Sequence, residues 1–219
     1  MSAPTWTILV PTIPERAETF GRLMYWLLPQ LEEHGGRVTV LARRNVGAIP
    51  LGELRDLMLH AAPGEYVSFI DDDDMVPDYY VVEVLRALED RPDHVGFQLN
   101  YFEDGRLSEV VDHSLRHGRW HRNLEGQLVR DLTHIDPVRR DLALRGQFGA
   151  ARRGRAEDRA WVKQVRPLLK TEAYIDKIMY HYLWSEAGSS WARNRVIAPA
   201  SVPLPELRSP YARWDPASV

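Results

Sequence analysis

Residues 64–80 read GEYVSFIDDDDMVPDYY, in which a short apolar run meets four consecutive aspartates. We call these aspartates the acidic run: Asp71, Asp72, Asp73 and Asp74. The preceding residues 65–70 are apolar and β-prone, and they predict a buried strand. Four adjacent carboxylates repel one another, so the run is costly unless a cation neutralises it. A helix cap is the alternative, although one or two aspartates would serve that purpose.

Strand-like and helix-like stretches alternate on both sides of the acidic run. Strands are predicted at residues 6–10, 37–42, 65–70 and 95–102. Helices are predicted between them, from apolar residues at helical spacing, at 20–31, 51–61 and 77–89. This order is typical of an α/β fold with a mostly parallel sheet, in which ligands lie beyond the carboxyl ends of the strands. The loops at 11–16 and 71–77 follow such ends.

The second half of the chain is less regular. A short strand pair is predicted within 106–113, helices at 137–144 and 157–165, and a strand at 177–185. Residues 146–155 are rich in Gly, Ala and Arg and predict a mobile loop. The proline-rich tail at 199–219 predicts a segment that wraps over the surface or is disordered.

Composition narrows the classes of site and partner. The 219 residues carry a formal charge of −3, so overall charge indicates neither a nucleic acid nor an anionic membrane as partner. The chain has no cysteine, so any metal must be held by oxygen or by histidine nitrogen. No signal sequence and no apolar run of about 20 residues is present, which predicts a cytoplasmic protein without a membrane segment.

Several segments in order resemble the family-2 glycosyltransferases of GT-A fold. They are ILVPTIPER (8–16), GELRD (52–56), GEYVSFIDDDDMVPDYY (64–80), AEDRAW (156–161) and YHYLW (180–184). The resemblance implies a GT-A-like, Rossmann-type mixed sheet that is mostly parallel and flanked by helices. It also implies an enzyme that moves a sugar from a nucleotide-diphosphate-sugar donor to an acceptor hydroxyl. The catalytic domain would be 1–198, with a donor-binding half at 1–102, an acceptor-binding half at 103–198 and the tail beyond.

The resemblance implies a set of donor-binding residues: Pro11, Thr12, Arg16, Arg55, Asp71 and Asp72. For Thr12, a capping box with Glu15 is the alternative. Arg55 matches the arginine of the family's Arg–Asn pair, but the next residue is Asp56 rather than Asn.

A divalent cation, Mn²⁺ or Mg²⁺, is expected because hard cations prefer oxygen ligands beside phosphates. The family's Asp-x-Asp motif maps onto Asp71 and Asp73, or onto Asp72 and Asp74. We expect Asp73 as the principal metal ligand, joined by Asp71 and His181. A core histidine is the alternative for His181, because it lies in an apolar strand.

Glu157 and Asp158 resemble the Glu–Asp motif whose aspartate is the general base of inverting members. An acceptor hydroxyl must lose its proton as it attacks the anomeric carbon, and a carboxylate can accept that proton. A helix start with favourable charges is the alternative.

The segment between Arg139 and Lys170 is strongly basic. Arg152, Arg153 and Arg155 lie beside the expected base and predict an acceptor that is a polyanion, such as DNA with a hydroxymethylated base. A solvated helix face is the alternative. A nucleotidyltransferase of similar sheet topology is a second candidate function, although loop 11–16 lacks its glycines. A non-catalytic metal-binding domain is a third.

Overall fold

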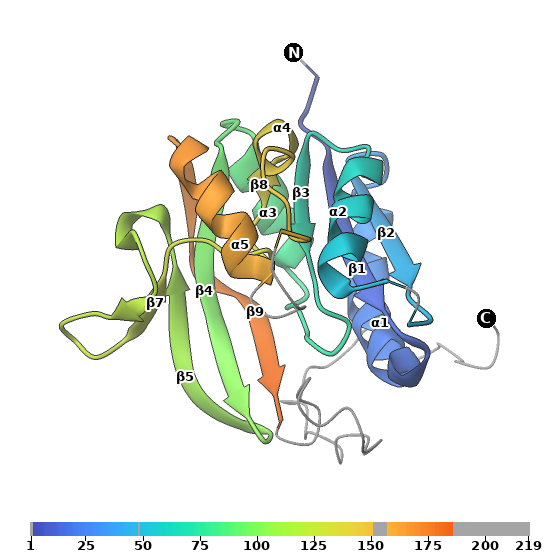
Figure 1. Cartoon of the computed structure of the whole chain (residues 1–219), viewed down its shortest axis with the longest axis horizontal. Coiled ribbons are helices and arrows are strands. Elements are labelled where there is room, and N and C mark those ends of the chain that lie inside the picture. The colour runs from blue at the N-terminus through green and yellow to red at the C-terminus, as the bar shows by residue number, and fades with distance from the viewer. Residues whose placement is uncertain (1, 48, 151–156, 186–219) are drawn as a thin grey trace.

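A mixed sheet of nine strands organises the described part of this computed structural model, which comprises residues 2–47, 49–150 and 157–185 (Figure 1). The strands are β1 (Trp6–Thr12), β2 (Val38–Arg44), β3 (Tyr66–Phe69), β4 (His94–Glu103), β5 (Arg106–His113), β6 (His121–Arg122), β7 (Leu128–Arg130), β8 (Val138–Arg139) and β9 (Glu172–Trp184). Their order is β2, β1, β3, β8, β4, β5, β7, β6, and β9 pairs with β4.

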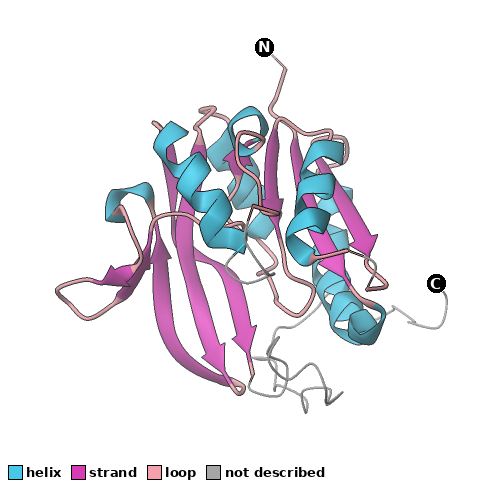
Figure 2. Cartoon of the chain, in the orientation of Figure 1, coloured by secondary structure: helices cyan, strands magenta, loops and turns pink. Residues whose placement is uncertain are grey.

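Helices cover both faces of this sheet (Figure 2). They are α1 (Ala17–Glu33), α2 (Leu51–Ala61), α3 (Tyr80–Leu88), α4 (Arg140–Ala143) and α5 (Glu157–Val165), with the 3₁₀ turns η1 (Pro14–Arg16), η2 (Leu115–His117) and η3 (Arg166–Leu168). Within the described ranges, none of them combines the length and the apolar character that crossing a bilayer requires.

The first half of the chain forms the parallel part of the sheet that the strand–helix alternation predicts. β1 pairs in parallel with β2 and with β3, so that Ile8 lies opposite Val40 on one side and Ser68 on the other. Helix α2 has the predicted bounds, whereas β1 and β2 continue to Thr12 and Arg44, beyond their predicted ends. The carboxyl ends of β1 and β3 therefore lie side by side.

The second half differs from the prediction in three places. Residues 137–144 begin with β8, not a helix, because the Pro137 carbonyl accepts the Val95 N–H at 2.9 Å and draws this segment into the sheet. The expected strand pair within 106–113 is the single strand β5, antiparallel to β4. β9 begins at Glu172 rather than at residue 177 and runs parallel to β4.

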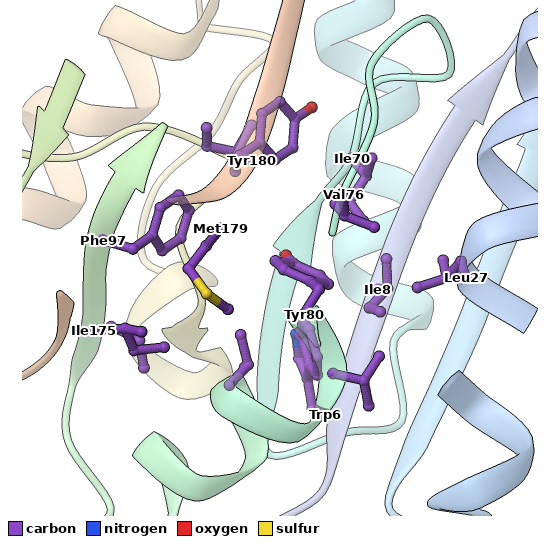
Figure 3. Close-up of a cluster of buried hydrophobic side chains, with 14 of the residues drawn as sticks. Trp6, Ile8, Leu27, Ile70, Val76, Tyr80, Phe97, Ile175, Met179 and Tyr180 are labelled. Carbon is purple, nitrogen blue, oxygen red and sulfur yellow. The ribbon is translucent and has the colours of Figure 1, made fainter. Parts of the chain in front are cut away.

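Side chains of β1 alternate between two cores. Trp6 and Ile8 point into the core that α1 and α3 cover, where Trp6 lies 5.4 Å from Tyr80 between ring centroids (Figure 3). Leu9 points into the other core, beneath α2 and α5. All three β1 side chains are fully buried, which is worth roughly 2 kcal/mol for each large apolar side chain. Burial on both faces fixes β1, and with it the loop that follows.

Candidate active site

The acidic run lies at the carboxyl end of β3, between β1 and β9. Ile70 donates its N–H to the Leu9 carbonyl at 3.0 Å, which continues the pairing with β1. Just beyond the run, Met75 and His181 exchange backbone hydrogen bonds of 3.1 and 2.8 Å. The run is thus anchored at both ends to strands from distant parts of the chain.

The four aspartates have two kinds of surroundings. Asp72 and Asp74 are each 2% exposed. Asp74 accepts the Tyr180 hydroxyl and the Leu183 N–H, both at 2.8 Å. Asp71 and Asp73 keep side-chain exposures of 24% and 32%. The two buried carboxylates therefore hold the loop in place, and the other two face the open side of the edge.

Arg16, from η1 after β1, binds two aspartates of the run. Its Nη1 lies 2.8 Å from an Asp72 oxygen and its Nη2 lies 2.9 Å from an Asp73 oxygen. The Thr12 hydroxyl donates to the Ile13 carbonyl at 3.4 Å. The expected capping box of Thr12 with Glu15 is wrong, because the 3₁₀ turn here has Ile13 at its N-cap and no side-chain cap. Arg16 links the two loops.

Arg55, on α2, is the buried cation at the centre of the site. Its Nη2 donates to Asp71 at 2.8 Å and its Nη1 donates to Asp158 at 2.6 Å. Glu157 lies 3.3 Å from the same Nη1. Burial lowers the pKa of the guanidinium, but the surrounding carboxylates outweigh that effect and raise it. Arg55 thus joins the acidic run to the Glu–Asp pair, although one segment ends at residue 74 and the other begins at 157.

His134 completes this network, and no motif in the sequence predicts its place there. Its Nε2 lies 3.2 Å from Asp71 and its Nδ1 lies 3.1 Å from Asp158. Burial and the charge of Arg55 lower the pKa of His134. The charges of Asp158 and Asp71 outweigh these effects and raise the pKa to about 9. The raised pKa favours a protonated imidazole between the two carboxylates at neutral pH, beside the Arg55 Nη2, which lies 3.1 Å from the His134 Nε2. The sequence around His134 does not predict this position, because its partner Asp71 is 63 residues away.

Asp158 is ionised and partly open. Burial raises its pKa, but the charges of His134 and Arg55 more than offset burial and lower the pKa to about 2. Its side chain remains 37% exposed. A carboxylate in this state can accept a proton from a group that becomes acidic during a reaction, and it is a weak base otherwise.

The pKa of Asp73 is shifted in the opposite direction from that of Asp158. Burial raises its pKa to about 6, and its neighbours Asp71 and Asp72 add to that rise against the charge of Arg16. The pKa of Asp74 is also raised well above its usual range, first by burial and then by Asp73 and Asp71. Arg16, Arg55 and His134 therefore leave negative charge uncompensated around Asp73.

His181 reaches the acidic run through its backbone and not through its ring. Side chains alternate along β9, so Tyr180 points to Asp74 whereas the His181 Nδ1 lies 3.3 Å from the side-chain nitrogen of Asn100. Burial alone lowers the pKa of His181, without an effect from the aspartates. Among the described residues no three His, Asp or Glu side chains form a group that could hold a metal ion. This arrangement does not provide the expected three-ligand set of Asp71, Asp73 and His181.

Asp56, which stands where the family's pattern has Asn, has a structural role. Its two carboxylate oxygens accept the N–H groups of Phe148 and Gly149, each at 2.8 Å. A side chain at Gly52 would collide with the Phe148 carbonyl at 2.8 Å. Close contact between α2 and this backbone therefore positions the segment that leads towards α5. Pro11 is the next-to-last residue of β1 and lies opposite Arg43 in the sheet. Arg152, Arg153 and Arg155 lie outside the described residues.

The charge on His134 predicts a pH dependence of stability. Because folding raises its pKa from 6.5 to about 9, the stabilisation is complete below pH 6.5 and is lost as the pH rises through 9. The loss is roughly 3 kcal/mol at about 1.4 kcal/mol per pKa unit. Urea unfolding should show the wild type losing stability over this window, and His134→Gln losing clearly less. Equal slopes in the two proteins would assign the titration to another group.

Comparison with known proteins identifies the fold. No protein-family model matches the chain, and no curated protein sequence matches it. Solved structures of S. aureus TarS do match. TarS 1-349 aligns with a TM-score of 0.57 and 15% identity over 82% of this chain and 60% of that one. Its complex with UDP-GlcNAc aligns with a TM-score of 0.55 and 14% identity, over 89% of this chain and 62% of that one. Its complex with UDP aligns with a TM-score of 0.56 and 15% identity, over 83% of this chain and 61% of that one.

At these identities the likeness concerns the fold. The chain spans about 60% of TarS 1-349 and 37% of a longer TarS structure. The expected GT-A-like α/β fold, with a mixed sheet flanked by helices, is confirmed.

Proposed function

We propose that the chain transfers a sugar from a nucleotide-diphosphate-sugar donor to an acceptor hydroxyl. The observation that carries this proposal is the convergence of Asp71 and Asp158 on the same two cations, Arg55 and His134. Donor-side and base-side carboxylates are thereby joined at one edge of a GT-A-like sheet. The TarS complexes with UDP-GlcNAc and UDP make uridine nucleotides the first donors to test.

Burial supports one register of the acidic run. Asp72 and Asp74 are committed to internal partners, which leaves Asp71 and Asp73 as the Asp-x-Asp pair. Both oxygens of Asp71 already contact Arg55 or His134, so Asp73 is the more open carboxylate. Arg16 and the last two residues of β1, Pro11 and Thr12, would line the donor side.

A divalent cation, Mn²⁺ or Mg²⁺, fits the surroundings of Asp73. Mg²⁺ beside phosphates keeps several waters and takes only one or two carboxylates, so a three-residue protein cage is not needed. The uncompensated negative charge around Asp73 supports a cation there. When bound, the metal would neutralise charge on the departing diphosphate.

The bond changes assign a task to Asp158. The acceptor oxygen forms a bond to the anomeric carbon, and the bond from that carbon to the diphosphate breaks, with its electron pair leaving on the diphosphate. The acceptor proton passes to the Asp158 carboxylate. Attack from the face opposite the diphosphate inverts the anomeric configuration. Glu157 and His134 would hold Asp158 and Arg55 in place.

Metal dependence gives the experiment that tests the donor site. UDP binding, measured by calorimetry with Mn²⁺ present, should be lost in Asp73→Asn and in excess EDTA. The amide removes the open carboxylate but keeps its size, so the fold should survive. Asp78→Asn is a matched control, because Asp78 is exposed beyond the run. Equal UDP affinity in Asp73→Asn and in EDTA would contradict the assignment.

The acceptor is proposed to be a polyanion, on the basic character of the segment between Arg139 and Lys170. Part of that charge is already paired, because Arg139 lies 2.8 Å from Asp93 and Arg166 lies 3.7 Å from Asp131. Arg152, Arg153 and Arg155 would extend the basic surface. Their joint replacement by Ala should weaken acceptor binding and reduce its dependence on salt.

A further inference from the structure

Two arginines and a tryptophan lie together beside Asp158. Arg130 ends β7, and Arg159 follows Asp158 on α5. Trp120 lies between η2 and β6, and its ring is within 3.6 Å of the Arg130 guanidinium carbon and 5.6 Å of that of Arg159. We call these residues the Arg130–Trp120–Arg159 cluster. Elements distant in sequence thus bring two cations to one aromatic ring.

The pairing of the two guanidinium groups differs from that of the other arginines of the site. Within residues 2–47, 49–150 and 157–185, neither arginine forms an ion pair with a carboxylate. Arg55 and Arg16, by contrast, each bind at least two carboxylates. Burial lowers the pKa of Arg130, and neighbouring Asp136 and Asp158 offset it only in part. A partly buried cation beside a like charge would be stabilised by an incoming anion.

The cluster lies near Asp158, the residue proposed to accept the proton of the acceptor hydroxyl. Arg159 directly follows Asp158 on α5, and burial lowers the pKa of Arg130 against the opposing charge of Asp158. The cluster therefore lies close to the proposed base and on the β5–β7 side of the sheet. Trp120 is 48% exposed, so its ring can also contact the carbon skeleton of a ligand.

We propose that the Arg130–Trp120–Arg159 cluster binds a phosphate group of the acceptor and so places the acceptor hydroxyl at Asp158. This rests on the proposed glycosyl transfer. Two guanidinium forks match the geometry of a phosphate, and a phosphate monoester carries close to two negative charges at neutral pH. Stacking on Trp120 holds Arg130 before the ligand arrives, which reduces the ordering cost of binding.

Inorganic phosphate, titrated in excess UDP, tests the proposal. The indole N–H signal of Trp120, identified by its loss in Trp120→Phe, should shift with phosphate although UDP fills the donor site. Arg159→Gln and Arg130→Gln should each weaken phosphate binding by about tenfold, the effect of one charge-assisted hydrogen bond. Arg86→Gln removes the same charge from an exposed position on α3 and should leave phosphate binding unchanged.

The controls separate this cluster from the donor site. Arg159 is exposed, so Arg159→Gln keeps the test valid if Arg130→Gln proves unstable. If UDP abolishes the phosphate shift, phosphate was reporting the donor site and the proposal is wrong. Equal phosphate affinity in Arg159→Gln and the wild type at constant ionic strength would also overturn it. Absence of UDP binding in the wild type would instead count against the proposed function, whether or not phosphate binds at Trp120.

Discussion

Asp158→Asn should lower the rate of sugar transfer by about 10²- to 10⁴-fold, the usual contribution of a general base. The amide cannot accept the proton of the acceptor hydroxyl, and it also loses the ion pairs with Arg55 and His134. Affinity for UDP should change little, because the donor side keeps Arg16 and Asp73. Release of nucleotide under saturating donor measures the rate, and NMR of the glycoside should show inverted anomeric configuration.

The neighbouring carboxylate supplies the control for this variant. Glu157 lies 3.3 Å from Arg55, against 2.6 Å for Asp158, and its side chain is less exposed. Glu157→Gln should therefore cost much less activity than Asp158→Asn. An Asp158→Asn protein that keeps nearly the wild-type rate, or a Glu157→Gln protein that loses as much, would place the base elsewhere. A product with retained configuration would exclude the single displacement.

Arg55→Met should destabilise the fold by about 3 kcal/mol, the lower end of the cost of removing one member of a buried ion pair, because Asp71 and Asp158 are partly exposed to solvent. Asp71 and Asp158 would then keep His134 as a contact cation, and Glu157 would lose its ion pair with Arg55. Because ionised carboxylates cause the loss, it should shrink as the pH falls towards 2 and they become protonated. Urea unfolding of both proteins at pH 7 and at pH 3 measures this.

Arg55→Lys provides the matched comparison, since it keeps the charge but not the planar fork. One ammonium cannot reach Asp71 and Asp158 with the same geometry, so an intermediate loss of stability is expected. A loss below about 1 kcal/mol in Arg55→Met at pH 7 would show that the network contributes little net stability, as some buried ion pairs do.

The parallel half of the fold could be predicted from the sequence because its signals are local. Each buried strand there is a short apolar run, and each helix shows apolar residues at helical spacing. β8 could not be predicted from the sequence, because it has only two residues and follows a proline, which is typical of a helix start. The start of β9 could not be predicted either, because the polar residues Glu172 and Asp176 interrupt the apolar pattern of the strand. Glu172 is nevertheless held in the sheet by His94, 3.0 Å away.

The segments that meet at Arg55 stand out in the sequence where a few neighbouring residues carry the signal. The acidic run and the Glu–Asp pair each stand out within a few residues, and the structure brings both to Arg55. His134 and Arg130 could not be found in this way, because the residues that they contact lie in other segments of the chain. His181 was assigned from its position in the family pattern, but alternation along β9 turns its ring towards Asn100. The sequence also could not decide which aspartates of the run are buried.

Turnover of donor tests the account most directly. Wild-type protein should slowly hydrolyse at least one nucleotide-sugar of a panel that includes UDP-GlcNAc, in the presence of Mn²⁺ or Mg²⁺. Water would replace the acceptor in that reaction. EDTA, Asp73→Asn and Asp158→Asn should each suppress the release of nucleotide. Glycosyl transfer at this site would be contradicted if the folded wild-type protein released nucleotide from no donor in the panel. It would also be contradicted if both variants released nucleotide as fast as the wild type.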